Sequence, residues 1–357
     1  MSSTLTAQAI VSYGDPLQAL QREIPAPSGT EVLLRVHRCG VCHSDVHLQD
    51  GYFDLGGDKR LDIGGSHRLP LIPGHEIQGT VVALGPEATG VAVGDARVAY
   101  PWIGCGTCPT CSRGEEHLCG GRPRCLGINV DGGYGDHVLV PHPRYLLDHT
   151  GIDPALAAIC MCSGLTAHSA LSRAAPLTDG EILAIVGLGG VGMMGLQLAR
   201  ARFPGARLLA LDVNDAKLDT ARDHGADAVC RADDPQALKQ CLKDTGGVLA
   251  AVDFVGSEAS LAAANRLVRK GGRVVIVGLF GGKFSMAIPL FPLRAVSLMG
   301  SYVGSLAEAR ELLALVARGG IAPIPMESRP LDAAGATLDD LRAGKVLGRV
   351  VLDCGAV

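Results

Sequence analysis

Short apolar runs separated by turn residues occupy much of the first 150 residues of the chain. The runs at 31–37, 79–84 and 138–140 have the length of short strands. Short strands divided by turns are typical of a compact β-rich domain. We therefore predict such a domain over residues 5–150.

From about residue 164 the hydrophobic pattern changes. Apolar runs of strand length now alternate with longer stretches that have the 3.6-residue period of a helix. Strands that alternate with helices predict a parallel, doubly wound α/β sheet. The expected strands cover 182–186, 207–211, 249–254 and 273–278, and the expected helices cover 193–202, 215–224 and 258–269.

The end of the chain again resembles the first domain. An amphipathic helix is predicted at 306–318, and the tail ends in an apolar run at 347–352. We interpret this run as a strand that returns to the β-rich domain. That domain is then discontinuous, with the α/β domain inserted in it, and a ligand cleft is expected between the two.

Length and charge agree with a soluble enzyme of two domains. At 357 residues the chain exceeds the usual size of one hydrophobic core. The formal net charge is only −4 and no basic stretch is present, so neither a nucleic acid nor a membrane is predicted as a partner. The almost uncharged run at 182–196 resembles a membrane span, but its five glycines break it well before the roughly 20 residues that a span needs.

Four cysteines fall close together in a loop rich in glycine and proline: Cys105, Cys108, Cys111 and Cys119. Zinc prefers four thiolates at about 2.3 Å in a closed structural site, and one loop can supply them all. Two disulfides are the alternative, but the chain shows no secretory signal, and 12 cysteines in 357 residues are too sparse for a disulfide scaffold. We therefore predict a structural zinc lobe at 105–119 and a cytoplasmic location.

A second group of possible metal ligands is dispersed along the chain. It comprises Cys42, His75 and one of the pair Cys160 and Cys162. Two thiolates, one imidazole and an open fourth position are typical of a catalytic zinc. Each residue alone also has an ordinary interpretation: Cys39 and Cys42 as a redox pair, His75 as a core histidine, and the later cysteines as small buried hydrophobes. Their side-chain chemistry does not distinguish Cys160 from Cys162.

A glycine-rich loop, Gly187-Leu188-Gly189-Gly190-Val191-Gly192, follows one predicted strand and precedes a helix. In that context the backbone amides at the helix start can hold a pyrophosphate. Asp212 closes the next strand about 20 residues further on, where a carboxylate can accept hydrogen bonds from both ribose hydroxyls. The carboxylate would repel a 2′-phosphate, which favours NAD over NADP. An acidic residue in an ordinary turn is the alternative.

These residues carry a resemblance, over essentially the whole chain, to the zinc-containing alcohol dehydrogenases of the medium-chain dehydrogenase/reductase family. The resemblance implies a GroES-like catalytic domain at 1–163 and 303–357 and an inserted Rossmann domain at 164–302. It also implies a homo-oligomer, a tetramer rather than a dimer, because the motifs Gly300 to Gly304 and Gly348 to Leu352 resemble the shorter-subunit branch of the family. Besides the four-cysteine lobe, the matching motifs are Gly40-Val41-Cys42-His43-Ser44-Asp45, Pro73-Gly74-His75-Glu76, Gly187 to Gly192, Gly300-Ser301-Tyr302-Val303-Gly304 and Gly348-Arg349-Val350-Val351-Leu352.

The resemblance implies a role for each residue of the dispersed group. Cys42, His75 and Cys162 would bind the catalytic zinc, since the residues after Cys162 match those that follow the family ligand. Glu76 would lie just behind them as a possible alternate ligand. Asp45 would orient His75, as metal-bound imidazoles usually require.

The resemblance also implies a proton relay through Ser44 and His47. A zinc-bound alcohol is acidified, and its proton would pass through the Ser44 hydroxyl and the cofactor ribose to His47 before hydride moves to the nicotinamide. Both residues could instead be ordinary polar residues.

Cofactor and substrate contacts follow from the same resemblance. His43 and Arg349 would neutralise the pyrophosphate, and Lys217 would lie beside Asp212. The other expected cofactor contacts are Thr166, Val277, Leu279, Ser301 and Val303. An apolar substrate pocket would be lined by Phe53, Trp102, Leu279 and Tyr302.

The stretch between Cys42 and His75 is roughly ten residues longer than the family pattern, and residues 54–68 look like an inserted loop. Our hypothesis is that the insertion edges the substrate entrance and selects what enters, and a plain surface insertion is the alternative.

The sequence as a whole predicts a zinc-dependent alcohol dehydrogenase. It would transfer hydride reversibly between a primary or secondary alcohol and NAD, giving an aldehyde or ketone. One alternative is a quinone or enone reductase of the same fold, but such relatives typically lack both zinc groups. The other is a nonenzymatic zinc–thiolate redox switch, against which the intact relay residues argue.

Overall fold

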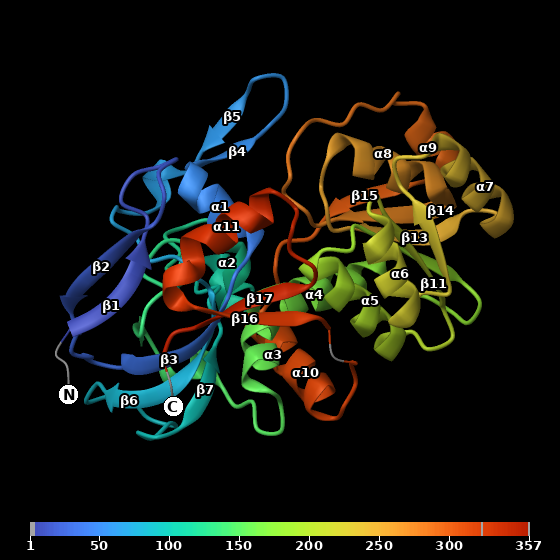
Figure 1. The fold of residues 1–357 in the computed structure, drawn as a ribbon. Coiled ribbons are helices and arrows are strands. Elements are labelled where there is room, and N and C mark those ends of the chain that lie inside the picture. The colour runs from blue at the N-terminus through green and yellow to red at the C-terminus, as the bar shows by residue number, and fades with distance from the viewer. Residues whose placement is uncertain (1–3, 323, 356–357) are drawn as a thin grey trace.

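The computed structural model describes residues 4–322 and 324–355 and contains two domains, each built around one large sheet (Figure 1). The catalytic domain holds a seven-stranded sheet in the order β16-β17-β3-β6-β7-β9, with β8 paired to β3. The strand bounds are β3 Val32–Gly40, β6 Glu76–Leu84, β7 Ala96–Ala99, β8 His137–Val140, β9 Leu146–Leu147, β16 Met326–Pro330 and β17 Arg349–Asp353.

The strand at the end of the chain lies in the first sheet. β17 pairs antiparallel with β3, so that Val351 lies opposite Gly40. This pairing is what the apolar tail predicted, whereas the residue boundaries 1–163, 164–302 and 303–357 stay a prediction. Two small hairpins complete this domain: β1 Thr4–Ala9 with β2 Gln18–Glu23, and β4 Tyr52–Asp54 with β5 Arg60–Asp62.

The register of β3 and β6 brings distant parts of the sequence together. β3 lies between neighbours and buries most of its side chains, which gives it a nearly continuous apolar run. It extends to Gly40, three residues beyond the predicted end, and Gly40 lies opposite Glu76 at the start of β6. The segments that carry Cys42 and His75 therefore meet at one end of the sheet.

The second domain is a doubly wound parallel sheet, which confirms the predicted fold class. Six strands run in the order β12-β11-β10-β13-β14-β15, and the order reverses between β10 and β13. The prediction missed β12 and β15, which are short and lie at the two edges of the sheet. The bounds are β10 Ile182–Val186, β11 Arg207–Asp212, β12 Ala228–Arg231, β13 Val248–Asp253, β14 Val268–Ile276 and β15 Ser297–Gly300.

Helices cover both sheets and the region between them. The helix after the glycine loop begins at Gly190 rather than at the predicted 193, because the last loop glycines already form its first turn. The bounds are α1 His43–Asp50, α2 Pro109–Ser112, α3 Pro154–Ile159, α4 Leu165–Ala174, α5 Gly190–Arg202, α6 Asp215–Asp223, α7 Pro235–Thr245, α8 Glu258–Leu267, α9 Leu290–Arg294, α10 Leu306–Ala317 and α11 Ala334–Arg342.

A π-helical turn, Cys160–Gly164, joins α3 and α4 into one continuous helix over Pro154–Ala174. By length and composition alone this helix could cross a membrane, but the core helix of a soluble protein can have the same length and composition. In the structure 83% of its apolar window is buried inside the protein, so we interpret it as a core helix. It carries Cys162 and Thr166 into the region between the domains.

The insertion at 54–68 forms most of the β4–β5 hairpin, which projects from the catalytic domain toward the second domain (Figure 1). Its tip touches the loop that follows β14. A methyl group built on Gly56 would lie 3.0 Å from the carbonyl carbon of Gly282, and one built on Gly281 would lie 2.8 Å from the carbonyl oxygen of Asp54. The hairpin therefore bridges the two domains.

Candidate active site and metal centres

Cys42, His75 and Cys162 form one compact buried group. Their ligand atoms all lie within 4.8 Å of one another, and none of the three side chains is more than 7% exposed. Cys42 precedes α1, His75 precedes β6, and Cys162 lies in the π-helical turn. The structure brings Cys162 rather than Cys160 to this group.

A buried carboxylate supports the imidazole of this group. Asp45 Oδ1 lies 3.3 Å from His75 Nδ1, while Asp45 Oδ2 accepts hydrogen bonds from the Cys42 backbone and the Tyr134 hydroxyl. An imidazole held at Nδ1 presents Nε2 to a metal. Both ring nitrogens of His75 are buried without a hydrogen-bond partner among the described residues, and Nε2, which faces no carboxylate there, fits a metal ligand.

The two thiols of the group also suit a metal ion. A hydrogen bond with Cys162 is the main reason that the pKa of Cys42 lies well below its usual value, and His75 lowers it further. Zinc binds the thiolate form of cysteine, so the lowered pKa of Cys42 favours metal binding. Two sulfurs and one imidazole nitrogen with one position left over match the donor set of a catalytic zinc.

Glu76 lies behind this group but is paired elsewhere. Its carboxylate accepts a hydrogen bond from the Ser163 backbone at 3.1 Å and forms a buried ion pair with Arg349. Burial raises the pKa of Glu76 to about 7, although Arg349 opposes that rise. An alternate ligand role for Glu76 stays a prediction, since its oxygens already have these partners.

The four-cysteine lobe is a second compact group. The sulfurs of Cys105, Cys108, Cys111 and Cys119 lie within 4.8 Å of one another. The Cys108 and Cys111 sulfurs are 3.4 Å apart, too far for a disulfide bond of about 2.05 Å, and all four cysteines are free thiols. Hydrogen bonds from Thr107 lower the pKa of Cys105 to about 5. The arrangement fits a closed zinc site.

The glycine loop lies at the point where the order of the parallel strands reverses, between β10 and α5. Dinucleotides bind at this place in doubly wound sheets. Asp212 ends β11 and is only 8% exposed, with Oδ2 accepting the Leu188 backbone N–H at 2.7 Å. Its carboxylate is thereby fixed beside the loop, where a ribose is expected.

Arg349, one of the predicted cofactor cations, packs against the glycine loop. Arg349 packs so closely that a methyl group on Gly190 would lie 2.1 Å from its Cδ atom. Desolvation lowers the pKa of His43, Cys42 opposes this, and the positive charges of Arg349 and Lys217 lower the pKa further. Arg349 Nε is buried without a hydrogen-bond partner among the described residues, which leaves it free for an anionic ligand.

The remaining predicted cofactor contacts fall into two groups. Thr166, Ser301 and Val303 are buried, and Ser301 Oγ has no hydrogen-bond partner among the described residues. Such an atom suits a polar group of a ligand. Val277 and Leu279 follow β14, and Leu279 is 45% exposed.

Aromatic side chains surround the dispersed metal group. The Trp102 ring lies 5.3 Å from the His75 ring and 5.9 Å from the Tyr302 ring, measured between centroids, and Trp102 Nε1 donates to the Met161 carbonyl. On α1, the His47 ring contacts Phe53 of the hairpin at 4.7 Å. Ser44 Oγ lies 3.7 Å from Cys42 Sγ. Ser44 and Trp102 thus contact the metal group, while Tyr302 packs on Trp102 and Phe53 on His47. The roles of the predicted relay and pocket residues stay predictions.

Sequence reasoning missed two buried polar side chains that support these groups. The Tyr134 hydroxyl donates to Asp45, and Glu116 accepts hydrogen bonds from Tyr145 and from the Gly104 backbone beside the lobe. Neither residue belongs to a spacing motif, so the sequence carries no signal for their roles.

The chain has two domains, a glycine loop where the order of the parallel strands reverses, and two cysteine-rich groups. Together these features define a metal-containing, nucleotide-dependent dehydrogenase. Comparison with known families agrees. Residues 28–148 match the alcohol dehydrogenase GroES-like domain, and residues 190–318 match the zinc-binding dehydrogenase family.

Similar proteins cover nearly the whole chain. NAD-dependent alcohol dehydrogenases of Sulfurisphaera tokodaii and Saccharolobus solfataricus are each 37% identical over 98% of this chain and 99% of their own. The crystal structure of an alcohol dehydrogenase from Aeropyrum pernix is similar with a TM-score of 0.87 and 31% identity, covering 98% of this chain and 99% of that chain. The chain belongs to the zinc-binding alcohol dehydrogenases of the medium-chain dehydrogenase/reductase family. The predicted enzyme class and the use of zinc and NAD are thereby confirmed.

Proposed function

We propose that this chain oxidises a primary or secondary alcohol to an aldehyde or ketone with NAD, and catalyses the reverse reaction, at the group formed by Cys42, His75 and Cys162. The observation that carries the proposal is the position of Arg349. It pairs with Glu76, the residue after His75, and its stem packs on Gly190 of the glycine loop. The metal group and the nucleotide loop therefore share one site.

The chain supplies matched ligand sets for two zinc ions. Cys42, His75 and Cys162 would hold the catalytic ion, and the four-cysteine lobe the structural one. When bound, the catalytic zinc supplies a Lewis acid that stabilises negative charge on a substrate oxygen. Asp45 keeps the His75 ring in the orientation that leaves Nε2 available, and NAD supplies the hydride acceptor when bound.

Proton movement would use one face of α1. Ser44 and His47 are three residues apart, so their side chains share that face. Ser44 lies at the metal group and would take the proton of the substrate hydroxyl. His47, which is partly buried under Phe53, would pass it to water.

NAD rather than NADP is supported by the position of Asp212. The carboxylate is fixed by the Leu188 and Asn214 backbone groups beside the loop. A 2′-phosphate placed there would meet a negative charge, whereas ribose hydroxyls would meet hydrogen-bond acceptors.

The substrate pocket would be apolar, with Trp102 and Tyr302 on one side, Phe53 on another and Leu279 at the nucleotide domain. The bridging hairpin supports the hypothesis that the insertion edges the entrance. A zinc-free reductase is disfavoured, because both cysteine groups are complete.

The enzyme would be cytoplasmic and homo-oligomeric, a tetramer rather than a dimer. Free thiols at every cysteine suit a reducing compartment. β15 is an edge strand, and the nearby segment exposes Phe280, Ile288 and Leu293 at 70, 81 and 67%. An open edge beside exposed apolar side chains favours pairing with a second copy.

The proposed reaction is tested by following NAD reduction by absorbance with primary, secondary, cyclic and aromatic alcohols. Wild type and Cys162→Ala are compared, with Cys160→Ala as the matched control and zinc counted in each. We expect turnover and two zincs per chain in wild type and in the control, and loss of turnover and of one zinc in Cys162→Ala. Full activity in Cys162→Ala would contradict the assignment.

A further inference from the structure

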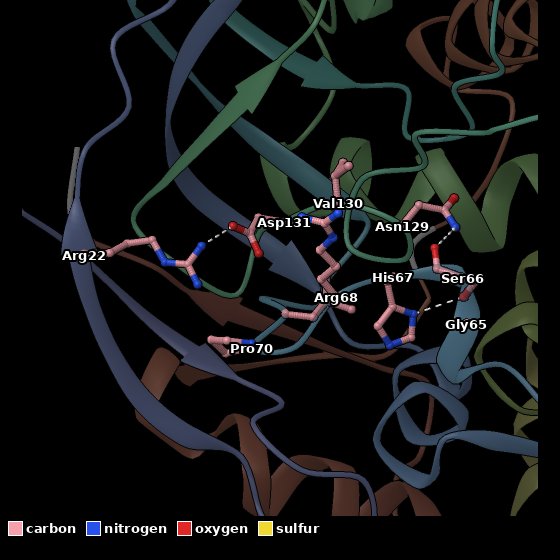
Figure 2. Close-up of a pocket in the computed structure, with 10 residues that line it drawn as sticks. Arg22, Gly65, Ser66, His67, Arg68, Pro70, Asn129, Val130 and Asp131 are labelled. Atoms are coloured by element: carbon pink, nitrogen blue, oxygen red, sulfur yellow. Dashed lines mark hydrogen bonds and ion pairs between the residues drawn. The ribbon is translucent and has the colours of Figure 1, made fainter.

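A cavity lies on the catalytic domain, apart from the candidate active site. Its volume is about 530 Å³, and none of its lining residues belongs to the metal groups or the glycine loop. Three segments form its walls: the end of β2, residues 65–71, and the loop at 129–131 (Figure 2).

The cavity has an excess of positive charge. Arg22 Nη1 pairs with Asp131 Oδ2 at 2.6 Å, and Asp131 Oδ1 accepts the Ile72 backbone N–H at 3.0 Å, so both carboxylate oxygens have partners. Arg68 has no hydrogen bond or ion pair with any residue that the structure describes. In Figure 2 it lies between the Arg22–Asp131 pair and His67. Two guanidinium groups therefore face one carboxylate.

The imidazole in the wall offers no free donor. Ser66 Oγ donates its only hydrogen to the Ile63 carbonyl at 2.7 Å, so the 3.1 Å contact with His67 requires His67 Nδ1 to be the donor. His67 Nε2 of the neutral ring can then only accept, so the Tyr13 hydroxyl donates to it at 3.0 Å in preference to the Gly64 carbonyl at 3.4 Å. Burial lowers the pKa of His67, which keeps the ring neutral near pH 7. Charge recognition is left to the two arginines.

We propose that this cavity binds a small organic oxyanion, a phosphate or carboxylate group carried on an apolar body. Guanidinium groups match the geometry of such oxyanions and bind them by charge-assisted hydrogen bonds. Pro70, Leu71 and Val130 supply apolar wall beside the charges. The volume falls within the usual range for small-molecule sites, about 300–1,000 Å³.

The site is tested by calorimetric titration of the metal-loaded enzyme saturated with NAD, so that the glycine loop is already occupied. The probes are phenyl phosphate, benzoate and inorganic phosphate at constant ionic strength. We expect phenyl phosphate to bind with a Kd on the order of 1 mM and inorganic phosphate to bind more weakly. Benzoate distinguishes the two sources: tighter binding than phenyl phosphate assigns a carboxylate ligand, and weaker binding assigns a phosphate.

Two variants of the cavity and one control variant identify the binding site. Arg68→Met should weaken phenyl phosphate binding about fivefold, whereas Arg60→Met should not, because Arg60 lies on the same insertion but stacks over Tyr52. Asp131→Asn removes the competing charge and keeps an acceptor for Ile72, so it should tighten binding about twofold. Neither arginine lines the metal groups or the glycine loop in the part of the chain that the structure describes, and the readout is binding heat rather than turnover.

Three results would overturn the proposal: wild-type affinity in Arg68→Met, an equal loss in Arg60→Met, or binding that disappears when NAD is present. Binding heat does not depend on turnover, so these outcomes are independent of the proposed dehydrogenase activity.

Discussion

At the scale of single residues, Arg349 contacts two different parts of the candidate site. Its guanidinium pairs with buried Glu76, and its stem packs on the glycine loop. A residue shared in this way couples the position of the loop to the carboxylate behind the metal group. It is also a residue whose loss should affect both cofactor binding and stability.

We expect Arg349→Ala to raise the Kd for NAD about tenfold or more, because one charge-assisted contact is lost. The variant also leaves the Glu76 carboxylate buried without its cation, which should cost on the order of 3 kcal/mol of unfolding free energy. Titration with NAD and denaturant unfolding measure the two effects. Arg342→Ala, which removes a partly exposed cation on α11, is the control and should change the Kd less than twofold. An unchanged Kd in Arg349→Ala would refute its cofactor role.

Phe53 is expected to set the pH range of the relay. Burial is the main reason that the pKa of His47 lies below its usual value. The charges of His43 and Arg342 lower this pKa further, whereas Asp50 and Cys42 raise it. Removing the Phe53 ring by Phe53→Ala exposes the imidazole, so its pKa should rise toward the ordinary value of about 6.5.

Alcohol oxidation requires neutral His47 to accept the proton, and the neutral form is lost as pH falls through its pKa. A raised pKa therefore moves the acid limb of kcat to higher pH. A profile of kcat from pH 5 to 8 measures the shift. Phe53→Leu keeps an apolar cover and should move the limb less, and equal profiles for Phe53→Ala and wild type would exclude the idea.

Individual residues also show how far sequence reasoning reaches. Cys42, His75 and Cys162 could be grouped from motifs, and the structure places them together. From side-chain chemistry alone Cys160 was equivalent to Cys162, because only the π-helical turn decides which thiol faces the group. Tyr134 could not be found, since its contact with Asp45 joins residues 89 positions apart.

At the scale of elements, the β4–β5 hairpin holds most of the segment that we predict to be an insertion relative to the family pattern. Its tip meets residues 281–283 of the nucleotide domain, and its base carries Phe53 beside His47. It therefore lies over the side of the site where the relay is expected.

Replacing residues 55–61 by a two-glycine link should change the ranking of alcohols by kcat/KM and leave the Kd for NAD unchanged. The reason is that the hairpin edges the proposed entrance but contacts no part of the glycine loop among the described residues. A Gly/Ser replacement of equal length for the tip residues is the control that separates the loss of side chains from the loss of chain. An identical ranking of alcohols would show that the insertion does not select the substrate.

Elements also differed in how well their patterns predicted them. The central strands β10, β11 and β13 are buried apolar runs, and their predicted bounds agree with the structure to within one residue. The edge strands β12 and β15 are four residues long and partly exposed, so they carry no clear hydrophobic period. Tertiary pairing, not local pattern, defines them.

At the scale of the whole molecule, the open edge of the second sheet predicts assembly. If copies pair there, the double variant Ile288→Glu and Leu293→Glu should form smaller assemblies than wild type, because charges would be buried in the interface. Light scattering after size exclusion gives the mass. Val93→Glu, at a site 63% exposed on the catalytic domain, is the matched control and should leave the mass unchanged. A wild-type chain that is monomeric would contradict the proposed oligomer.

The two cysteine-rich groups differ in how much of the chain must be in place before they exist. The lobe draws its four sulfurs from fifteen residues, so it needs only a short loop to close. The dispersed group joins Cys42 to Cys162 and cannot form until the sheet and the core helix have packed. A nascent chain can therefore capture an ion in the lobe long before the other position is assembled. In a cell short of zinc, the expected product is a folded chain that carries one ion and cannot turn over.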